Sequence, residues 1–192
     1  KLDMLQYCVQ TLTRRGYVFI GMDHFAKPDD ELSVALREGL LQRNFQGYST
    51  YADCDLVAIG VSSIGKIGST YSQNERNIDD YYAAIDAGHL PVMRGYQLNQ
   101  DDLLRRTVIQ DLMCRFALDY RAYESVFGIP FGHYFKEELA DLQQLTELGL
   151  VRLSSHSLKV TPKGRFLIRN IAMVFDYHLR HKETKAKYSQ TV

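Results

Sequence analysis

The segment from Arg43 to Thr50 combines side chains that could together bind a flat, polar ligand. The planar guanidinium group of Arg43 could hold a carboxylate through two parallel hydrogen bonds. The ring of Phe45 could stack on a heterocycle, and the amide of Gln46 offers a donor and an acceptor to the polar edge of such a ring. A structural role, in which Phe45 fills the core and its neighbours lie at the surface, explains the same composition equally well.

Asp23 and His24 form a second candidate because they follow a short apolar run, Tyr17 to Ile20, that is typical of a buried strand. Enzymes of the α/β class place functional groups just beyond the carboxyl ends of their strands. The imidazole of His24 could transfer a proton near neutral pH or bind a propionate group. The alternative is an ordinary hydrogen-bonded histidine in a loop that enters a helix.

The spacing of the three cysteines excludes a local metal-binding or iron–sulfur motif. Cys8, Cys54 and Cys114 lie 46 and 60 residues apart, so no two of them form a CxxC or CxxxCxC pair. Dispersed cysteines in an odd number are typical of reduced thiols, and we therefore expect a cytoplasmic protein.

Residues 1–95 alternate between helical and strand-like patterns, which favours β/α elements. Apolar residues at helical spacing predict a helix from Leu2 to Arg15, directly before the strand-like run that ends at Ile20. A second helix is expected after Pro28, where an acidic first turn meets the positive end of the helix dipole. The segment from Arg43 to Thr50 has no periodicity and is expected to be a loop.

A second strand-like run follows this loop. The continuous apolar stretch from Asp55 to Val61 predicts another buried strand. It leads into Ser62 to Gly68, whose glycines would let the backbone approach a ligand closely. Asn77 then predicts the N-cap of a helix that ends near Ala87.

Residues 96–192 are expected to form a second, mostly helical domain with a frayed polar tail at 182–192. The order of helices, hairpin and closing helix resembles a winged helix. These elements are expected at about 99–116, 120–126, 134–148, 150–161 and 162–180.

Charge argues against a nucleic-acid partner. Lys plus Arg and Asp plus Glu both number 23, so the formal net charge is zero. The helical segment that would contact DNA in a winged helix, 131–149, carries four acidic residues and one lysine. Phosphate binding requires an excess of Lys and Arg. The composition, 45% hydrophobic and 24% charged, is that of a globular protein, and no apolar run is long enough to span a membrane.

Three segments resemble a known family: GYVFIGMDHFAKPDDELSVA, RNFQGYSTYADCDLVAIGVSSIG and GRFLIRNIAMVFD. They are similar, in this order, to the later part of the oxygen-independent coproporphyrinogen III oxidases, the radical S-adenosylmethionine (radical SAM) enzymes of haem biosynthesis. The resemblance covers nearly the whole chain. It implies an α/β plus α fold in which residues 1–95 are the last elements of an incomplete (β/α) barrel and residues 96–192 are the family's helical C-terminal domain.

The resemblance also implies a reaction. In this family a 4Fe-4S cluster, held by a CxxxCxC motif, cleaves S-adenosylmethionine to a 5′-deoxyadenosyl radical. From each of two propionates of coproporphyrinogen III, one such radical takes a hydrogen atom. Each substrate radical then loses CO₂ and gives one electron to a terminal acceptor, which leaves a vinyl group of protoporphyrinogen IX. The full-length enzyme is expected to be a cytoplasmic monomer that acts on this small molecule, without nucleic-acid or membrane partners.

Five residues carry the expected binding roles. By resemblance, Phe45 and Gln46 match positions that contact a second S-adenosylmethionine, and Ile64 matches one that contacts the cluster-bound molecule. Arg43 and His24 are hypotheses for substrate binding, based only on their chemistry. No catalytic residue or metal ligand is expected here. The cluster motif belongs to the family's N-terminal part, so residues 1–192 alone are expected to bind no cofactor and to be inactive.

Two other functions are compatible with the sequence. A haem chaperone related to the radical SAM enzymes would bind haem without decarboxylating a substrate. A stand-alone winged-helix module would mediate an interaction through its C-terminal half.

Overall fold

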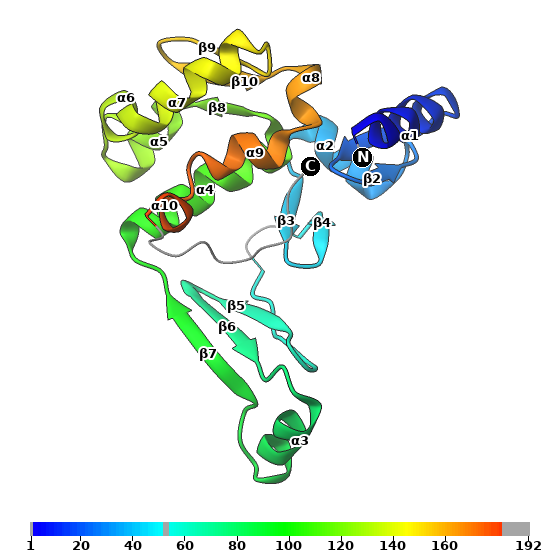
Figure 1. Cartoon of the computed structure of the whole chain (residues 1–192), viewed down its shortest axis with the longest axis vertical. Coiled ribbons are helices and arrows are strands. Elements are labelled where there is room, and N and C mark those ends of the chain that lie inside the picture. Colours follow the sequence, from blue (N-terminus) through cyan, green and yellow to red (C-terminus); the bar gives the residue numbers. More distant parts are fainter. Residues whose placement is uncertain (1, 52–53, 182–192) are drawn as a thin grey trace. The chain divides into compact units, whose positions relative to one another are not determined.

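The computed structural model describes residues 2–51 and 54–181 of the chain. These residues form two compact units, one of residues 2–51 with 104–181 and one of residues 54–103. Figure 1 shows the elements in chain order. The first unit thus combines parts of both domains expected from sequence. The predicted domains, 1–95 and 96–192, were defined by position in the sequence, whereas the two units are defined by packing. The predicted division therefore stays a prediction.

The first unit begins with a helix and a tight hairpin. Helix α1 (Leu2–Arg14) leads into β1 (Val18–Gly21), which pairs antiparallel with β2 (His24–Ala26). The predicted helix and strand are confirmed, but His24 lies at the start of β2 and not in a loop. The chain reverses at once because Met22 adopts a left-handed conformation, with φ of 54°.

Helix α2 (Glu31–Glu38) has side-chain and glycine caps. The Asp30 carboxylate accepts a hydrogen bond from Leu32 N at 2.9 Å, and Gly39 ends the helix with φ of 70°. An acidic N-cap and a left-handed glycine at the end are local signals. The helix expected after Pro28 is therefore confirmed.

The segment expected to be a loop at 43–50 is a hairpin instead. Strands β3 (Gln42–Asn44) and β4 (Gly47–Ser49) pair antiparallel, with Asn44 opposite Gly47. Asn44 Oδ1 accepts from Gln46 N at 2.8 Å, and Gly47 has φ of 136°. The prediction failed because strands of three residues show no period-two pattern.

The C-terminal part of the first unit has the predicted winged-helix outline. Helix α4 (Gln100–Arg115) is followed by α5 (Tyr120–Phe127), α6 (Phe131–Tyr134) and α7 (Lys136–Glu147). The three-stranded sheet has the order β8 (Ala117–Asp119), β10 (Ser157–Val160), β9 (Val151–Leu153). The hairpin at 150–161 is confirmed, and β8 adds a strand that the sequence did not predict.

The closing helix expected at 162–180 is three short helices: α8 (Pro162–Arg165), α9 (Ile168–Met173) and α10 (Tyr177–Arg180). Thr161 caps α8 as predicted, accepting from Gly164 N at 3.0 Å. The single long helix is wrong because the Asp176 carboxylate caps a new helix, accepting from Leu179 N at 2.9 Å. The predicted frayed tail lies outside the described residues.

The core of the first unit is built on the predicted ridge of α4. Leu104, Val108 and Leu112 are buried at i, i+4 spacing. Aromatic rings complete the core, with Phe131 4.3 Å from Tyr120 and 4.7 Å from Phe135, measured between ring centroids. This core joins the winged-helix elements to the hairpins at the start of the chain.

The second unit is an antiparallel sheet of β5 (Ile64–Ile67), β6 (Thr70–Asn74) and β7 (Val92–Gln97), with α3 (Ile78–Asp86) between β6 and β7 in the chain. The helix capped by Asn77 is confirmed. The strand expected at 55–61 is wrong, since only Leu56 forms a bridge, to Lys66, and Ile59 is 83% exposed.

Candidate functional site

The first unit brings His24 and Arg43 together around the buried ring of Tyr48. The His24 and Tyr48 rings meet edge to face, with centroids 5.1 Å apart. The guanidinium carbon of Arg43 lies 4.7 Å from the centroid of the Tyr48 ring. The three side chains come from β2, β3 and β4, so the two short hairpins place both hypothesised substrate-binding residues on one aromatic ring.

The Tyr48 hydroxyl fixes this cluster to helix α4. It donates a hydrogen bond to the Met113 carbonyl oxygen at 3.0 Å in a buried position. Burial raises the pKa of Tyr48 to about 12, although the nearby Arg43 charge acts in the opposite direction. Tyr48 is therefore a neutral hydrogen-bond donor near neutral pH and not a base. Nothing in the sequence pattern distinguished Tyr48 from the other residues of this segment.

The position of His24 depends on a glycine. A Cβ atom at Gly47 would lie 3.0 Å from His24 Nε2, so a larger residue would displace the imidazole ring. His24 Nδ1 lies 2.9 Å from Oδ1 of the exposed Asp23. Asp23 and His24, which were proposed together from the sequence, thus lie close to each other, with the histidine turned toward β4.

A second guanidinium group, from Arg165, reaches the same region from α8. Its Nη2 donates to the carbonyl oxygens of Phe19 at 2.9 Å and Ile20 at 3.2 Å, at the end of β1. The group stacks 4.1 Å from the centroid of the Phe116 ring. Burial lowers the pKa of Arg165, and Tyr48 is among the groups that influence it. Sequence analysis missed this role because only the fold brings α8 beside β1.

Phe45 and Gln46 form the tip of the β3–β4 hairpin. Phe45 is 56% exposed, which excludes the alternative in which its ring fills the core. Gln46 is also exposed, and its backbone N–H is held by the Asn44 side chain. An exposed ring beside an exposed amide fits a flat ligand with a polar edge. Their assignment to S-adenosylmethionine stays a prediction.

Ile64 belongs to the second unit, where it is the first residue of β5 and half-buried. The turn before it contains two left-handed residues, Gly60 with φ of 103° and Ser62 with φ of 61°. A Cβ atom at Gly65 would lie 3.0 Å from the Leu56 carbonyl oxygen. The backbone around Ile64 is therefore closely packed and needs glycine.

The described residues do not fit a 4Fe-4S cluster. Cys8 and Cys54 are exposed and Cys114 is buried. Within residues 2–51 and 54–181, no three His, Cys, Asp or Glu side chains lie close enough to hold a metal ion. In the same part of the chain, no helix has the length and apolar character needed to cross a membrane.

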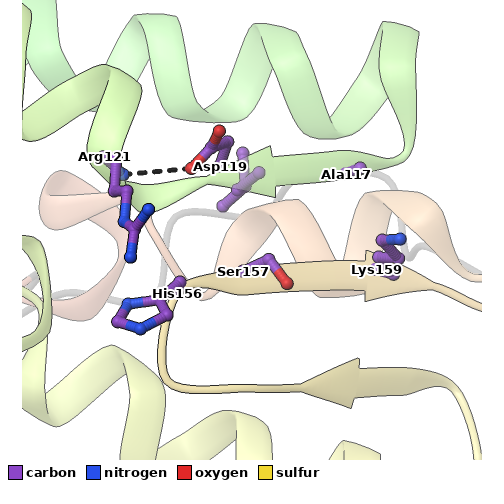
Figure 2. Close-up of a pocket in the computed structure, with 7 residues that line it drawn as sticks. Ala117, Asp119, Arg121, His156, Ser157 and Lys159 are labelled. Atoms are coloured by element: carbon purple, nitrogen blue, oxygen red, sulfur yellow. Dashed lines mark hydrogen bonds between the residues drawn. The ribbon is translucent and has the colours of Figure 1, made fainter.

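A shallow pocket of about 420 Å³ lies on the winged-helix sheet (Figure 2), and none of the predicted site residues lines it. Arg121, His156 and Lys159 are the basic residues of its lining. Asp119 caps α5 there by accepting from Arg121 N at 3.2 Å. The carboxylate is thus engaged in helix capping.

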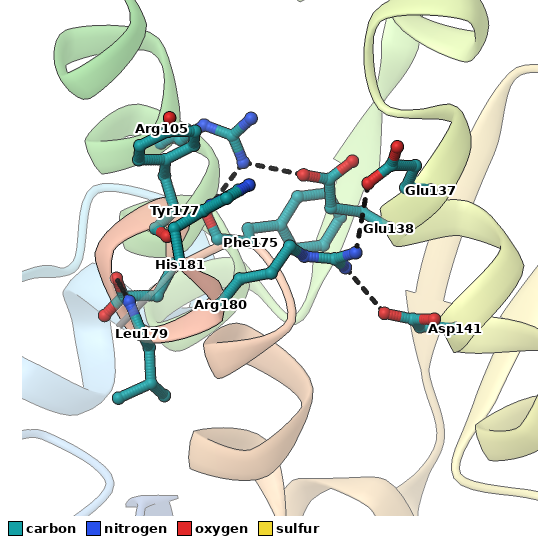
Figure 3. Close-up of polar contacts among 10 residues, drawn as sticks. Arg105, Glu137, Glu138, Asp141, Phe175, Tyr177, Leu179, Arg180 and His181 are labelled. Atoms are coloured by element: carbon teal, nitrogen blue, oxygen red, sulfur yellow. Dashed lines mark hydrogen bonds and ion pairs between the residues drawn. The ribbon is translucent and has the colours of Figure 1, made fainter. Parts of the chain in front are cut away.

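Ion pairs fasten α10 and α4 to α7 (Figure 3). Arg105 Nη1 lies 2.8 Å from Glu138 Oε1 and donates to the Phe175 carbonyl oxygen at 3.1 Å. Arg180 contacts Asp141 at 2.6 Å and Glu137 at 3.4 Å. Three of the four acidic residues that argued against DNA binding thus pair with arginines of α4 and α10, and Glu138 is the buried one among them.

Comparison with known proteins begins with a family model that matches part of the chain. Residues 98–167 match the family model described as the HemN C-terminal domain. This range contains α4 to α7 and the winged-helix sheet.

Matches to individual proteins span the whole of this chain and are more specific. The chain is 50% identical over 192 residues to the oxygen-independent coproporphyrinogen III oxidase of Salmonella typhimurium, covering 100% of this chain and 42% of that protein. Identity to the Escherichia coli enzyme is 48%, with the same coverage of both chains. The chain therefore corresponds over its whole length to a C-terminal part of the oxygen-independent coproporphyrinogen III oxidases, and it spans about two fifths of their length.

A solved structure of the same family also matches this chain. Coproporphyrinogen III oxidase (HemN) from Escherichia coli, described as a radical SAM enzyme, matches with a TM-score of 0.89 and 50% identity, covering 93% of this chain and 41% of that one. The resemblance and the predicted fold class are confirmed. The described residues form mixed helix and sheet without a closed barrel, as expected for a C-terminal portion.

Proposed function

We propose that this chain is the C-terminal part of a radical SAM oxidoreductase that acts on coproporphyrinogen III. The complete enzyme would convert two propionate groups to vinyl groups and release protoporphyrinogen IX. The proposal is supported above all by about 50% identity to such enzymes over the whole chain. The longer protein would supply the cluster and its cysteine ligands, because the described residues offer no metal site.

We further infer that Phe45 and Gln46 hold one S-adenosylmethionine and that Ile64 contacts another. The exposed hairpin tip supports the first assignment, and the closely packed glycine-flanked strand start supports the second. The bound cofactor supplies the radical chemistry. The residues of this chain bind and orient it through a stacking ring, an amide and a backbone edge.

For the substrate we propose Arg43 and His24 as partners of a propionate. Arg43 Nη1 is buried and makes no hydrogen bond within the part of the chain that the structure describes. A buried cationic donor in this state favours an anionic ligand. Two guanidinium groups and an imidazole lie around Tyr48, so the region suits a carboxylate.

Product analysis of the full-length protein tests the proposed reaction. The protein with its cluster reconstituted under anaerobic conditions should convert coproporphyrinogen III to protoporphyrinogen IX in the presence of S-adenosylmethionine and a reductant. Haem binding without this product would instead support the chaperone alternative. Salt-sensitive retardation of duplex DNA, again without product, would support the winged-helix module.

The Gln46→Ala variant of the full-length protein tests the cofactor assignment. It should weaken S-adenosylmethionine binding and lower turnover, with an unchanged circular dichroism spectrum. Gln143→Ala, which removes an exposed amide on α7, is the matched control. Unchanged turnover and affinity in the Gln46 variant would reject the role of the hairpin tip.

A further inference from the structure

We propose that Asn74 and Tyr81 are positioning residues that fix the turn at 58–63 and thereby set the position of Ile64. This inference rests on the proposed function, because it takes Ile64 as a cofactor contact. Neither residue is assigned a contact with cofactor or substrate. Both act through the backbone of the turn.

The turn has a conformation that its own sequence does not favour. Ser62 has φ of 61°, a left-handed value that a residue with a side chain adopts only at a cost in free energy. Gly60 has φ of 103°. Such a turn keeps one shape only when neighbouring groups hold it, so the contacts of its backbone groups determine where β5 begins.

Asn74, the last residue of β6, holds the turn through three carbonyl groups. Its side chain is 3% exposed, and Nδ2 donates to the carbonyl oxygens of Ala58 at 3.3 Å and Gly60 at 3.0 Å. Its backbone N–H donates to the Ser63 carbonyl oxygen at 2.9 Å. A single buried amide thus uses both of its side-chain protons on the turn.

Tyr81, on α3, binds the same turn. Its hydroxyl oxygen accepts a hydrogen bond from Gly60 N at 3.1 Å. The carbonyl of Gly60 is bound by Asn74, so the N–H and the carbonyl of one glycine are held by side chains from two different elements. Ser62 is fixed as well, because its N–H donates to the Glu75 carbonyl oxygen at 2.7 Å.

The consequence concerns the residue that follows the turn. Ile64 opens β5 and is paired with Gln73, the neighbour of Asn74 in β6. When the turn relaxes, the first residue of β5 loses its fixed position, while the rest of the strand stays paired up to Ile67. Loss of either side-chain anchor should therefore weaken cofactor binding more than it changes the fold.

Tyr81→Phe is the main test, because it removes one hydroxyl group and keeps the ring. The matched control is Tyr82→Phe at the neighbouring tyrosine, which is 58% exposed. Hydrogen exchange of residues 58–64 measures the turn, and equilibrium binding of S-adenosylmethionine to the reconstituted full-length protein measures its effect. Asn74→Ala serves as a second, stronger variant.

Tyr81→Phe should speed exchange in the turn and raise the dissociation constant and KM for S-adenosylmethionine by about three- to tenfold, the effect of one hydrogen bond. The change in kcat should be smaller. Asn74→Ala should act in the same direction with a larger effect, and Tyr82→Phe should leave exchange and affinity unchanged.

The outcomes separate this inference from the proposed function. Wild-type protein that binds no S-adenosylmethionine would overturn the proposed function itself. Wild-type binding with unchanged affinity in Tyr81→Phe, whether or not exchange becomes faster, would overturn only the positioning role.

Discussion

Tyr48 is the residue on which the hypothesised substrate-binding side chains converge. Its ring contacts His24 and Arg43, and its hydroxyl group binds the carbonyl of Met113, 65 positions away in sequence. Each contact depends on a different hairpin or helix. The sequence motif RNFQGY contains this tyrosine, but only the folded chain shows that it links the hairpins to α4.

Tyr48→Phe should destabilise the protein by about 1–2 kcal/mol, because it leaves the buried Met113 carbonyl without this donor. Urea denaturation of both proteins followed by circular dichroism measures the difference. Tyr51→Phe removes a hydroxyl group from an exposed ring and should change the stability by less than about 0.5 kcal/mol. Equal stability of all three proteins would show that the hydrogen bond does not hold the cluster.

Alkaline pH should destabilise the fold through buried acids. Burial raises the pKa of Tyr48 from 10.0 to about 12 and that of Cys114 from 9.0 to about 12. The unfolded chain therefore loses these protons first, so the stability they contribute is complete below about pH 9 and is lost as pH rises toward 12. The urea concentration at the midpoint of unfolding should stay constant up to about pH 9 and then fall. The fall should be less steep in Tyr48→Phe, because that variant lacks one of the two buried acids. A midpoint that rises above pH 9 would contradict this assignment.

At the scale of elements, Gly164 shows how closely α8 packs against Leu150, the residue between α7 and β9. A Cβ atom there would overlap the Leu150 carbonyl oxygen, which also accepts from Thr161 N at 2.9 Å. Gly164→Ala should therefore cost about 2–3 kcal/mol of stability. Gly132→Ala, in α6, meets no atom within 4 Å and should be neutral or stabilising by about 0.5 kcal/mol. Thermal denaturation of the two variants compares the sites, and equal melting temperatures would refute the close contact.

Two adjacent glutamates of α7 should differ strongly in how much they contribute to the free energy of unfolding. Glu138 is 6% exposed and pairs with Arg105 at 2.8 Å, whereas Glu137 is 78% exposed and lies 3.4 Å from Arg180. Glu138→Ala should cost about 3 kcal/mol, because it removes one buried carboxylate that pairs with an arginine side chain only 12% exposed. Glu137→Ala should cost less than about 1 kcal/mol. Chemical denaturation measures the stability of both variants, and equal losses for Glu138→Ala and Glu137→Ala would contradict the larger contribution of the buried pair.

Elements with local signals were predictable, and elements with distant partners were not. Asp30, Asn77 and Asn99 cap helices through side chains two or three residues away, so the sequence contains the whole interaction. Strand β8 has three residues and pairs with β10, some forty positions later. The apolar run at 55–61 looked like a strand because its composition is apolar, yet Gly60 and Ser62 turn the chain there.

In the candidate site, too, local features were predictable from the sequence and contacts between distant residues were not. Phe45 and Gln46 were identifiable because they are adjacent and chemically distinctive, and their hairpin exposes both. His24 and Arg43 were proposed separately, and nothing in their spacing showed that they share Tyr48. Arg165 was not among the predicted site residues, because its partners lie far away in sequence: its guanidinium group is packed on Phe116 and bound to β1.

At the scale of the whole molecule, the described residues contain the proposed binding positions, and no group of potential metal ligands lies among them. Its two compact units contain the proposed S-adenosylmethionine positions, one at a hairpin tip and one at a strand start. The two enterobacterial relatives, of which this chain covers 42%, are more than twice as long as it. Catalysis is accordingly proposed for the longer protein, with this part binding and orienting cofactor and substrate.

The most direct test is the amount of CO₂ released per coproporphyrinogen III consumed by the reconstituted full-length protein under anaerobic conditions. We expect two molecules of CO₂ for each substrate converted, together with consumption of S-adenosylmethionine. Consumption of S-adenosylmethionine with no CO₂ release from the porphyrinogen would contradict the proposal that this chain is part of a coproporphyrinogen III oxidase.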